Sequence, residues 1–230
     1  MNKLERDIER LRLKINNDFQ NEQTGHDVVH LENVLDYARR INIEEKADEY
    51  VIAVSALLHD IHRLMSTKEH YVTPKESLEV VEEILRKNNI DKIPEILYCI
   101  ENHEDKQNSH LYNLETQILQ DADALDAIGQ RGLDRTLQYC KVRNIPVTNF
   151  EHPLDDKDYV PNINPISTCH FIYRTMIPNG KNLNTSAARK IAESEIAILE
   201  RFIIEQYKKN GKTPDFENNR ESNNVKLKRQ

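Results

Sequence analysis

The chain has 230 residues but no tryptophan, only five glycines and only three cysteines. So few glycines, without any long Gly, Pro or Ser linker, favour helices and one domain large enough to bury a core. Cys99, Cys140 and Cys169 lie far apart, and none belongs to a C-x-x-C pair. This spacing indicates neither the disulfide framework of a small secreted protein nor a thiolate zinc site.

Long apolar runs and an excess of positive charge are also missing. The first residues contain no apolar signal core, and no stretch approaches the ~20 apolar residues that span a bilayer. We therefore expect a cytoplasmic protein without membrane insertion. The net charge of −7 argues against a protein that coats nucleic acid, because binding to the phosphate backbone relies on clustered Lys and Arg. A local basic pocket is still compatible with this charge.

Hydrophobic periodicity predicts an all-α fold. Leu4, Ile8, Leu11 and Ile15 recur at helical spacing, which is typical of an amphipathic helix that packs against the body of a protein. No segment shows the period of two that is typical of a strand. Further helices are predicted over residues 27–43, 45–63, 73–87, 94–102, 114–129 and 184–208, and another begins near residue 166.

Proline marks both a helix start and a long loop. Thr73, Pro74 and Glu76 form a start signal, since Thr can cap, Pro suits the first helical position and Glu completes a capping box. Residues 144–165 contain four prolines and three aspartates, which favour an extended surface loop. Three regions are expected: an N-terminal helix packed on the body (1–20), the main domain (21–209) and a polar, disordered tail (210–230).

Histidines and aspartates recur in an order that suits a metal site. His30 comes first, His59-Asp60 follows the apolar run 54–58, and Asp121, Asp123 and Asp126 lie close together further on. Imidazole nitrogen and carboxylate oxygen together suit Mn, Fe, Co, Ni or Zn better than Ca. This combination points to hydrolysis.

The ordered set His30, His59-Asp60 and Asp123, the last within Ala122-Asp123-Ala124-Leu125-Asp126, resembles the H…HD…D signature of HD-domain metal-dependent phosphohydrolases. The resemblance continues through residues 25–30, 120–129, 169–171 and 183–185, and so covers roughly residues 21–208. The nearest resemblance is to the bacterial branch that contains small nucleotide pyrophosphohydrolases. It implies an all-α HD-domain helical bundle and a divalent metal cofactor, with Mn favoured and Mg, Co, Ni, Fe or Zn as alternatives.

The resemblance also implies roles for single residues. His30, His59, Asp60 and Asp123 would bind the metal, and Asp121 is the main rival of Asp123. Asp60 would also orient the attacking water, and Asp126 would support a ligand histidine or the water. Substrate-binding roles fall to the basic side chains near these positions: His26, His62, Arg63, His103 and Arg135.

Two of these substrate residues have an alternative interpretation. His26 could be a surface residue at a helix N-terminus. For His62 both a place in the cleft and a surface position stay open, because many HD relatives have glycine there and this chain has no small residue.

The resemblance implies hydrolysis of a nucleotide, with a nucleoside triphosphate split to the monophosphate and pyrophosphate. One alternative is a nucleoside monophosphate phosphatase, which uses the same centre. Another is a non-catalytic, metal-bearing module that senses nucleotides. The expected partner is a small phosphorylated molecule rather than nucleic acid or a membrane, and a homo-oligomer is compatible with the sequence.

Overall fold

The computed structural model describes residues 2–20, 26–67, 69–161 and 163–216, and these residues form an all-α protein. They contain no strand, only one isolated bridge between Val160 and Asn164. No helix in the described ranges is long and apolar enough to cross a membrane. All three cysteines are buried and free.

The chain divides into two compact units, the first formed by Met1–Asp126 with Leu183–Lys190 and the second by Ala127–Asn182 with Ile191–Gln230. The long helix α11 (Ser186–Lys209) begins in the first unit and continues in the second. The predicted domain limits at residues 21 and 209 stay a prediction. Most of the predicted tail, residues 217–230, lies outside the described residues.

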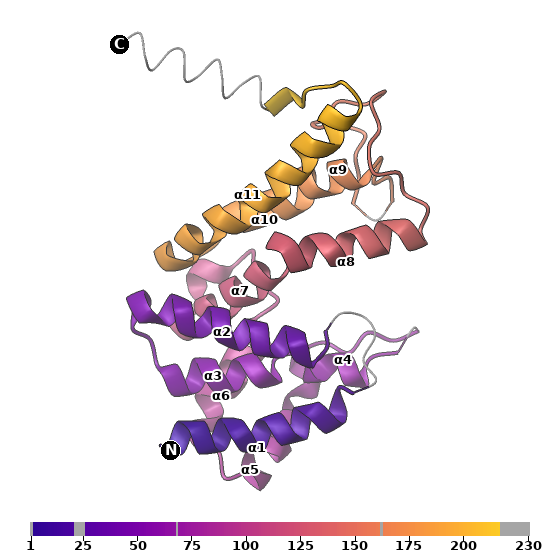
Figure 1. The fold of residues 1–230 in the computed structure, drawn as a ribbon. Coiled ribbons are helices and arrows are strands. Elements are labelled where there is room, and N and C mark those ends of the chain that lie inside the picture. Colours follow the sequence, from indigo (N-terminus) through magenta and orange to yellow (C-terminus); the bar gives the residue numbers. More distant parts are fainter. Residues whose placement is uncertain (1, 21–25, 68, 162, 217–230) are drawn as a thin grey trace, which may run out of the picture. The chain divides into compact units, whose positions relative to one another are not determined.

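The first unit contains the helices that carry the predicted ligands. Helix α2 packs against both α3 and α7, and α3 also contacts α1, α6 and α7 (Figure 1). The bounds of the helices are α1 Lys3–Asp18, α2 Val28–Glu45, α3 Glu49–Leu58, α4 Ile61–Met65, α5 Leu78–Lys87, α6 Ile93–Asn102 and α7 Leu114–Asp126.

Helix α1 has the amphipathic pattern that the sequence predicted. The Asn2 side chain caps it by accepting from the Glu5 amide, and Ile8, Leu11 and Ile15 are fully buried. Since α1 packs on α3, this apolar stripe joins the core of the first unit. Burial of such side chains stabilises the unit by about 1.5–3 kcal/mol each.

Helix α3 lies at the centre of this core, because every residue from Val51 to Leu58 is buried. Asp48 caps its first turn by accepting from the amides of Tyr50 and Val51. The helix therefore begins at Glu49, after Lys46 has ended α2 in the left-handed conformation. The predicted start at residue 45 was wrong for this reason.

The prediction of one helix as far as Arg63 was also wrong, since α3 ends at Leu58 and α4 begins at Ile61. The His59 ring uses Nδ1 to donate to the Ala56 carbonyl, at 2.9 Å, and this carbonyl is the one that a continuing helix would offer to the Asp60 amide. The His62 ring donates in the same way to the His59 carbonyl, at 3.1 Å. Side chains thus compete for backbone carbonyls, and His59 and Asp60 lie in a turn between two helices.

The capping box at residue 73 is confirmed. The Thr73 amide donates to the Glu76 carboxylate and the Glu76 amide donates to the Thr73 hydroxyl. A single 3₁₀ turn, Lys75–Ser77, comes first and leads directly into α5.

The second unit contains helix α8 (Gly129–Val142), α9 (Thr168–Phe171), a π-helical turn (Ile172–Met176) and α10 (Ile177–Lys181). The predicted helix over 114–129 ends three residues early, because Gly129 takes a positive φ of 70° and begins α8. A side chain at this position would collide with Glu195. Helix α8 itself was not predicted.

The proline-rich segment before α9 contains no helix in its described residues, as predicted, and hydrogen bonds attach it to α9. The amides of Thr168 and Cys169 donate to the carbonyls of Pro146 and Val147. Buried His170 donates from Nε2 to the Pro153 carbonyl, at 2.9 Å. These bonds hold two points of the loop against the first turn of α9.

Candidate metal centre

The predicted ligands come from three places in the first unit. His30 lies in the first turn of α2, where Asp27 caps the helix by accepting from the His30 amide at 2.9 Å. His59 and Asp60 form the turn between α3 and α4. Asp123 belongs to α7, which packs on both α2 and α3. The helix packing therefore brings side chains that are far apart in the sequence to one point.

The two histidines face each other through their Nε2 atoms, which are 3.2 Å apart. His30 uses Nδ1 to donate to Asp126, at 2.7 Å, and His59 uses Nδ1 to donate to the Ala56 carbonyl. With Nδ1 protonated, each neutral ring directs the lone pair of Nε2 at the other ring. Two facing lone pairs repel each other unless a proton or a cation lies between them, so this pair is suited to a shared metal ion.

Two carboxylates complete this group. Asp60 Oδ2 lies 3.2 Å from Nε2 of His30 and 3.5 Å from Nε2 of His59. Asp123 Oδ1 lies 3.6 Å from Nε2 of His30. The ligand atoms of His30, His59 and Asp123 all lie within 4.8 Å of one another. Two imidazole nitrogens and two carboxylate oxygens at such distances fit a divalent ion with mixed N and O ligands.

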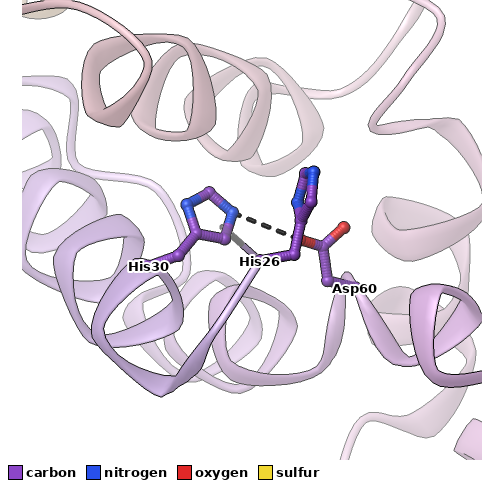
Figure 2. A group of neighbouring side chains, drawn as sticks. All are labelled: His26, His30 and Asp60. Atoms are coloured by element: carbon purple, nitrogen blue, oxygen red, sulfur yellow. Dashed lines mark hydrogen bonds and ion pairs between the residues drawn. The ribbon is translucent and has the colours of Figure 1, made fainter. Parts of the chain in front are cut away.

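Hydrogen bonds to neighbouring side chains orient the ligands. Asp126 accepts from His30 with one oxygen and from the Asn33 amide group with the other, at 2.7 Å in both cases. His26 lies on the other side, with its Nδ1 atom 2.7 Å from Asp60 Oδ2. Figure 2 shows His26, His30 and Asp60 drawn together at this point, with an ion pair between His30 and Asp60. His26 thus lies beside the ligands, within hydrogen-bond distance of Asp60.

Burial and charge shift the pKa values of the histidine ligands in opposite directions. Burial alone would lower the pKa of His30, but its hydrogen bonds to Asp126 and Asp60 and the charge of Asp123 raise this pKa to about 9. Burial dominates at His59 and lowers its pKa. The two rings thus differ, and without a bound cation His30 is the ring that holds a proton at neutral pH.

The carboxylate ligands are held in their charged form. Burial would raise the pKa of Asp60, but its interaction with His59 and its hydrogen bonds with His26 and His30 hold this pKa well below its ordinary value. Burial would also raise the pKa of Asp123, but Lys106, His59 and His30 lower it. Carboxylates that are charged at all ordinary pH values attract a cation to the centre.

Other predicted substrate residues form a second group beside the first. His62, His103 and Glu104 offer ligand atoms within 4.8 Å of one another, and His103 lies against His59 with ring centroids 5.0 Å apart. Buried His62 faces the centre rather than the surface, since its Nε2 atom lies 4.0 Å from Asp60 Oδ1. Burial lowers the pKa of His103 to about 4, so this ring is neutral.

Arg63 is paired more tightly than the sequence indicated. Its guanidinium donates to Glu104 at 2.6 Å and lies 3.5 Å from Asp60 Oδ1. The Tyr71 hydroxyl donates to the other oxygen of Glu104, at 2.6 Å. Burial would raise the pKa of Glu104, but hydrogen bonds from His62 and Tyr71 lower it to about 2. Arg63 therefore shares its charge with a permanently charged glutamate.

Asp121 does not join the ligand group. Its carboxylate accepts from the amides of Asn184 and Thr185, at 2.8 Å each, and from the Thr185 hydroxyl at 2.7 Å. Asp121 thus anchors the turn before α11, which favours Asp123 as the ligand. Arg135 lies on α8 in the second unit, and its role as a substrate residue stays a prediction.

Sequence reasoning missed two contacts of the centre. Lys106 donates from Nζ to Asp123 Oδ2 at 2.8 Å, and Glu104 and Tyr71 connect His62 with Arg63. Glu104 could have been noticed because it directly follows His103. Lys106 and Tyr71 lie in irregular segments, where no periodicity indicates the direction of a side chain.

The centre lies within a recognisable family domain. Residues 28–128 match the family model of the HD domain, and this range contains His30, His59, Asp60 and Asp123. The part of the chain that carries the four predicted ligands is thus similar to the HD domain. The all-α fold that the sequence predicted is confirmed, and the match agrees with the resemblance that its motifs indicated.

Individual relatives extend the likeness beyond this domain. YpgQ of Bacillus subtilis strain 168 is 25% identical over 200 residues, which are 85% of this chain and 89% of YpgQ. The crystal structure of YpgQ in complex with ADP has a TM-score of 0.67 at 22% identity and covers 90% of this chain and 96% of that one. An HD-superfamily hydrolase from Bacillus thuringiensis has a TM-score of 0.70 at 24% identity, covering 90% of this chain and 98% of its own.

Proposed function

We propose that this protein hydrolyses a nucleoside triphosphate to the monophosphate and pyrophosphate, with a divalent ion bound by His30, His59, Asp60 and Asp123. The observation that carries the proposal is the pair of Nε2 atoms 3.2 Å apart, with carboxylate oxygens of Asp60 and Asp123 beside them. Mn²⁺ is the proposed ion, since a mixed set of imidazole and carboxylate ligands suits it.

A divalent ion bound at such a centre lowers the pKa of a water molecule and neutralises the charge that develops on phosphoryl oxygens. The side chains of this chain supply orientation and proton binding. Asp126 and Asn33 hold the His30 ring in one orientation, a kind of support that commonly changes metal affinity 10–100-fold when it is lost. His26 holds a proton at Nδ1 next to Asp60 Oδ2 on the more exposed side of the centre.

Two further observations support a nucleotide as the substrate. The relative YpgQ was crystallised in complex with ADP. The negative net charge of this chain disfavours a polyanion as large as nucleic acid but not a small phosphorylated molecule. The proposed setting is the cytoplasm, where Mg²⁺, Mn²⁺ and nucleotides are available.

The test compares turnover of NTPs, dNTPs, nucleoside monophosphates and an aryl phosphate with Mn²⁺, Co²⁺, Ni²⁺ or Mg²⁺, with the products identified by phosphorus NMR. We expect equal amounts of monophosphate and pyrophosphate. Asp60→Asn should abolish turnover and lower metal content. Asp36→Asn, which changes an exposed carboxylate on α2, should behave like the wild type.

The products also separate the alternatives. Release of orthophosphate from monophosphates alone would replace the proposal with a phosphatase. Nucleotide binding without turnover of any substrate, with the metal retained, would replace it with a sensing module.

A further inference from the structure

A lysine that the sequence did not indicate contacts the centre directly. Lys106 Nζ lies 2.8 Å from Asp123 Oδ2. We infer that Lys106 binds the phosphate chain of the substrate beside the metal ligands. The inference rests on the proposed function and adds to it the residue that recognises the substrate's charge.

The backbone around Lys106 is held firmly against α7. Gln120, a residue of α7, donates from Nε2 to the carbonyls of Asn102 and Asp105, at 2.9 and 3.2 Å. The Ser109 hydroxyl donates to the Lys106 carbonyl at 2.7 Å. These hydrogen bonds therefore fix the backbone of Lys106, and with it the position from which the side chain reaches Asp123.

The two oxygens of Asp123 have different partners. Oδ1 faces Nε2 of His30 at 3.6 Å, whereas Oδ2 accepts from Lys106. Asp123 can thus offer Oδ1 to a metal ion while Lys106 keeps Oδ2. The ammonium group accordingly lies next to the ion's position without having to leave when an ion binds.

Charge around the centre explains why a further cation is needed there. The carboxylates of Asp60, Asp123 and Asp126 outnumber the two charges of a divalent ion, and a nucleotide adds several more negative charges. Arg63, which the sequence indicated as a phosphate-binding residue, forms an ion pair with Glu104 at 2.6 Å. Lys106 has three donors, and its side chain is 46% exposed, so it can contact Asp123 and still offer a donor to a phosphate oxygen.

The test uses Lys106→Met, which keeps the aliphatic stem, and Lys106→Arg, which keeps the charge. Lys87→Met is the matched control, because Lys87 is an exposed lysine of α5 in the same unit and pairs with Glu83 of its own helix. Calorimetry first measures the affinity of each metal-free variant for Mn²⁺. Each variant is then loaded with Mn²⁺, and calorimetry measures its affinity for ADP, pyrophosphate and adenosine. Steady-state kinetics with the preferred nucleotide separate KM from kcat.

We expect Lys106→Met to weaken binding of ADP and pyrophosphate about tenfold or more, as for loss of a charge-assisted hydrogen bond. The affinities for adenosine and for Mn²⁺ should change by less than about threefold. KM should rise by more than kcat falls, Lys106→Arg should recover most of the loss, and Lys87→Met should match the wild type.

Unchanged affinity of Lys106→Met for ADP and pyrophosphate would overturn the inference. So would a loss of Mn²⁺ affinity with normal ADP affinity at saturating Mn²⁺, since Lys106 would then only position Asp123. Failure of the wild type to bind either phosphate compound would overturn it as well. If the wild type binds ADP through Lys106 but hydrolyses no nucleotide, the inference holds and the proposed function fails. If Lys106→Met hydrolyses the triphosphate normally with an unchanged KM, the proposed function holds and the inference fails.

Discussion

The chemistry of the centre depends on which nitrogen of each imidazole carries the proton. Nδ1 of His59 faces a carbonyl, which can only accept, so the proton lies on Nδ1. Nδ1 of His30 faces the Asp126 carboxylate, which also accepts, so Nδ1 of His30 carries a proton as well. Both Nε2 atoms are thereby left for a metal ion, and the neighbouring groups, rather than the ligands alone, determine this.

Asp126→Asn tests that dependence. The amide keeps the shape of the carboxylate but removes its charge, and it has one acceptor oxygen where the carboxylate accepts from His30 and Asn33 with two. We expect Mn²⁺ affinity to fall about 10–100-fold in equilibrium dialysis, with helicity unchanged by circular dichroism. The Asp36→Asn control should bind like the wild type. Equal affinities in both variants would show that Asp126 does not orient a ligand.

Proton release tests the charge state of His30. Its pKa is raised to about 9 in the ion-free protein, so at about pH 7.5 a metal ion must displace a proton from the ring. Mn²⁺ affinity should therefore increase with pH up to about 9. Calorimetry in buffers of different ionisation enthalpy should show release of close to one proton per ion at about pH 7.5 and less above pH 9. A binding enthalpy independent of the buffer would contradict this.

The sequence could indicate some of these residues and not others. His59-Asp60 were recognisable because an unpaired polar pair at the end of the apolar run 54–58 would be costly without a purpose. Asp121 and Asp123 could not be separated with certainty, since they are two residues apart on a helix and only the packing of α7 decides which one faces His30. Lys106 had no signal, because its direction depends on the bonds from Gln120 to the turn after α6.

At the scale of the element, sequence signals predicted helix ends well where local hydrogen bonds of the backbone determine them. The capping box at Thr73 and Glu76 is confirmed, as is the end of α5 at Lys87. The break between α3 and α4 could not be predicted from propensity, because it follows from the rings of His59 and His62 bonding to backbone carbonyls. A turn that departs from the helical expectation therefore presents two of the four predicted ligands, His59 and Asp60.

The contact of α1 with α3 depends on a buried carboxylate. Asp7 accepts from the Tyr50 hydroxyl of α3 at 2.6 Å and from Lys3 at 2.8 Å, and it also pairs with Arg10. Burial would raise the pKa of Asp7, but Lys3, Tyr50 and Arg10 lower it below 3.8. A lowered pKa in the folded state stabilises the protein above the unfolded value, and this stabilisation is lost as the pH falls through the folded value.

Asp7→Asn should therefore lower the free energy of unfolding by about 1–3 kcal/mol near pH 7. The difference from the wild type should shrink near pH 3, where Asp7 of the wild type begins to be protonated. Urea denaturation at the two pH values measures both effects, with Asp36→Asn as the control. An equal deficit at both pH values would mean that the charge of Asp7 does not stabilise this contact.

At the scale of the whole molecule, the HD domain match ends at residue 128, near the end of the first unit. The centre lies entirely in that unit and joins residues that are distant in the sequence, such as His30 and Asp126, which are 96 positions apart. Periodicity predicted most helices of this unit but not the break between α3 and α4, whereas the expectation that His30, His59-Asp60 and Asp123 meet came from the resemblance. Helix α8 shows the limit of periodicity, since it was not predicted at all.

The most direct test of the centre is anomalous diffraction at the manganese edge from crystals grown with Mn²⁺. We expect one strong peak at about 2.0–2.3 Å from Nε2 of His30, Nε2 of His59 and a carboxylate oxygen each of Asp60 and Asp123. The peak should disappear in Asp60→Asn crystals grown under the same conditions. An ion bound elsewhere, or Asp123 outside coordination distance of a bound ion, would contradict the account.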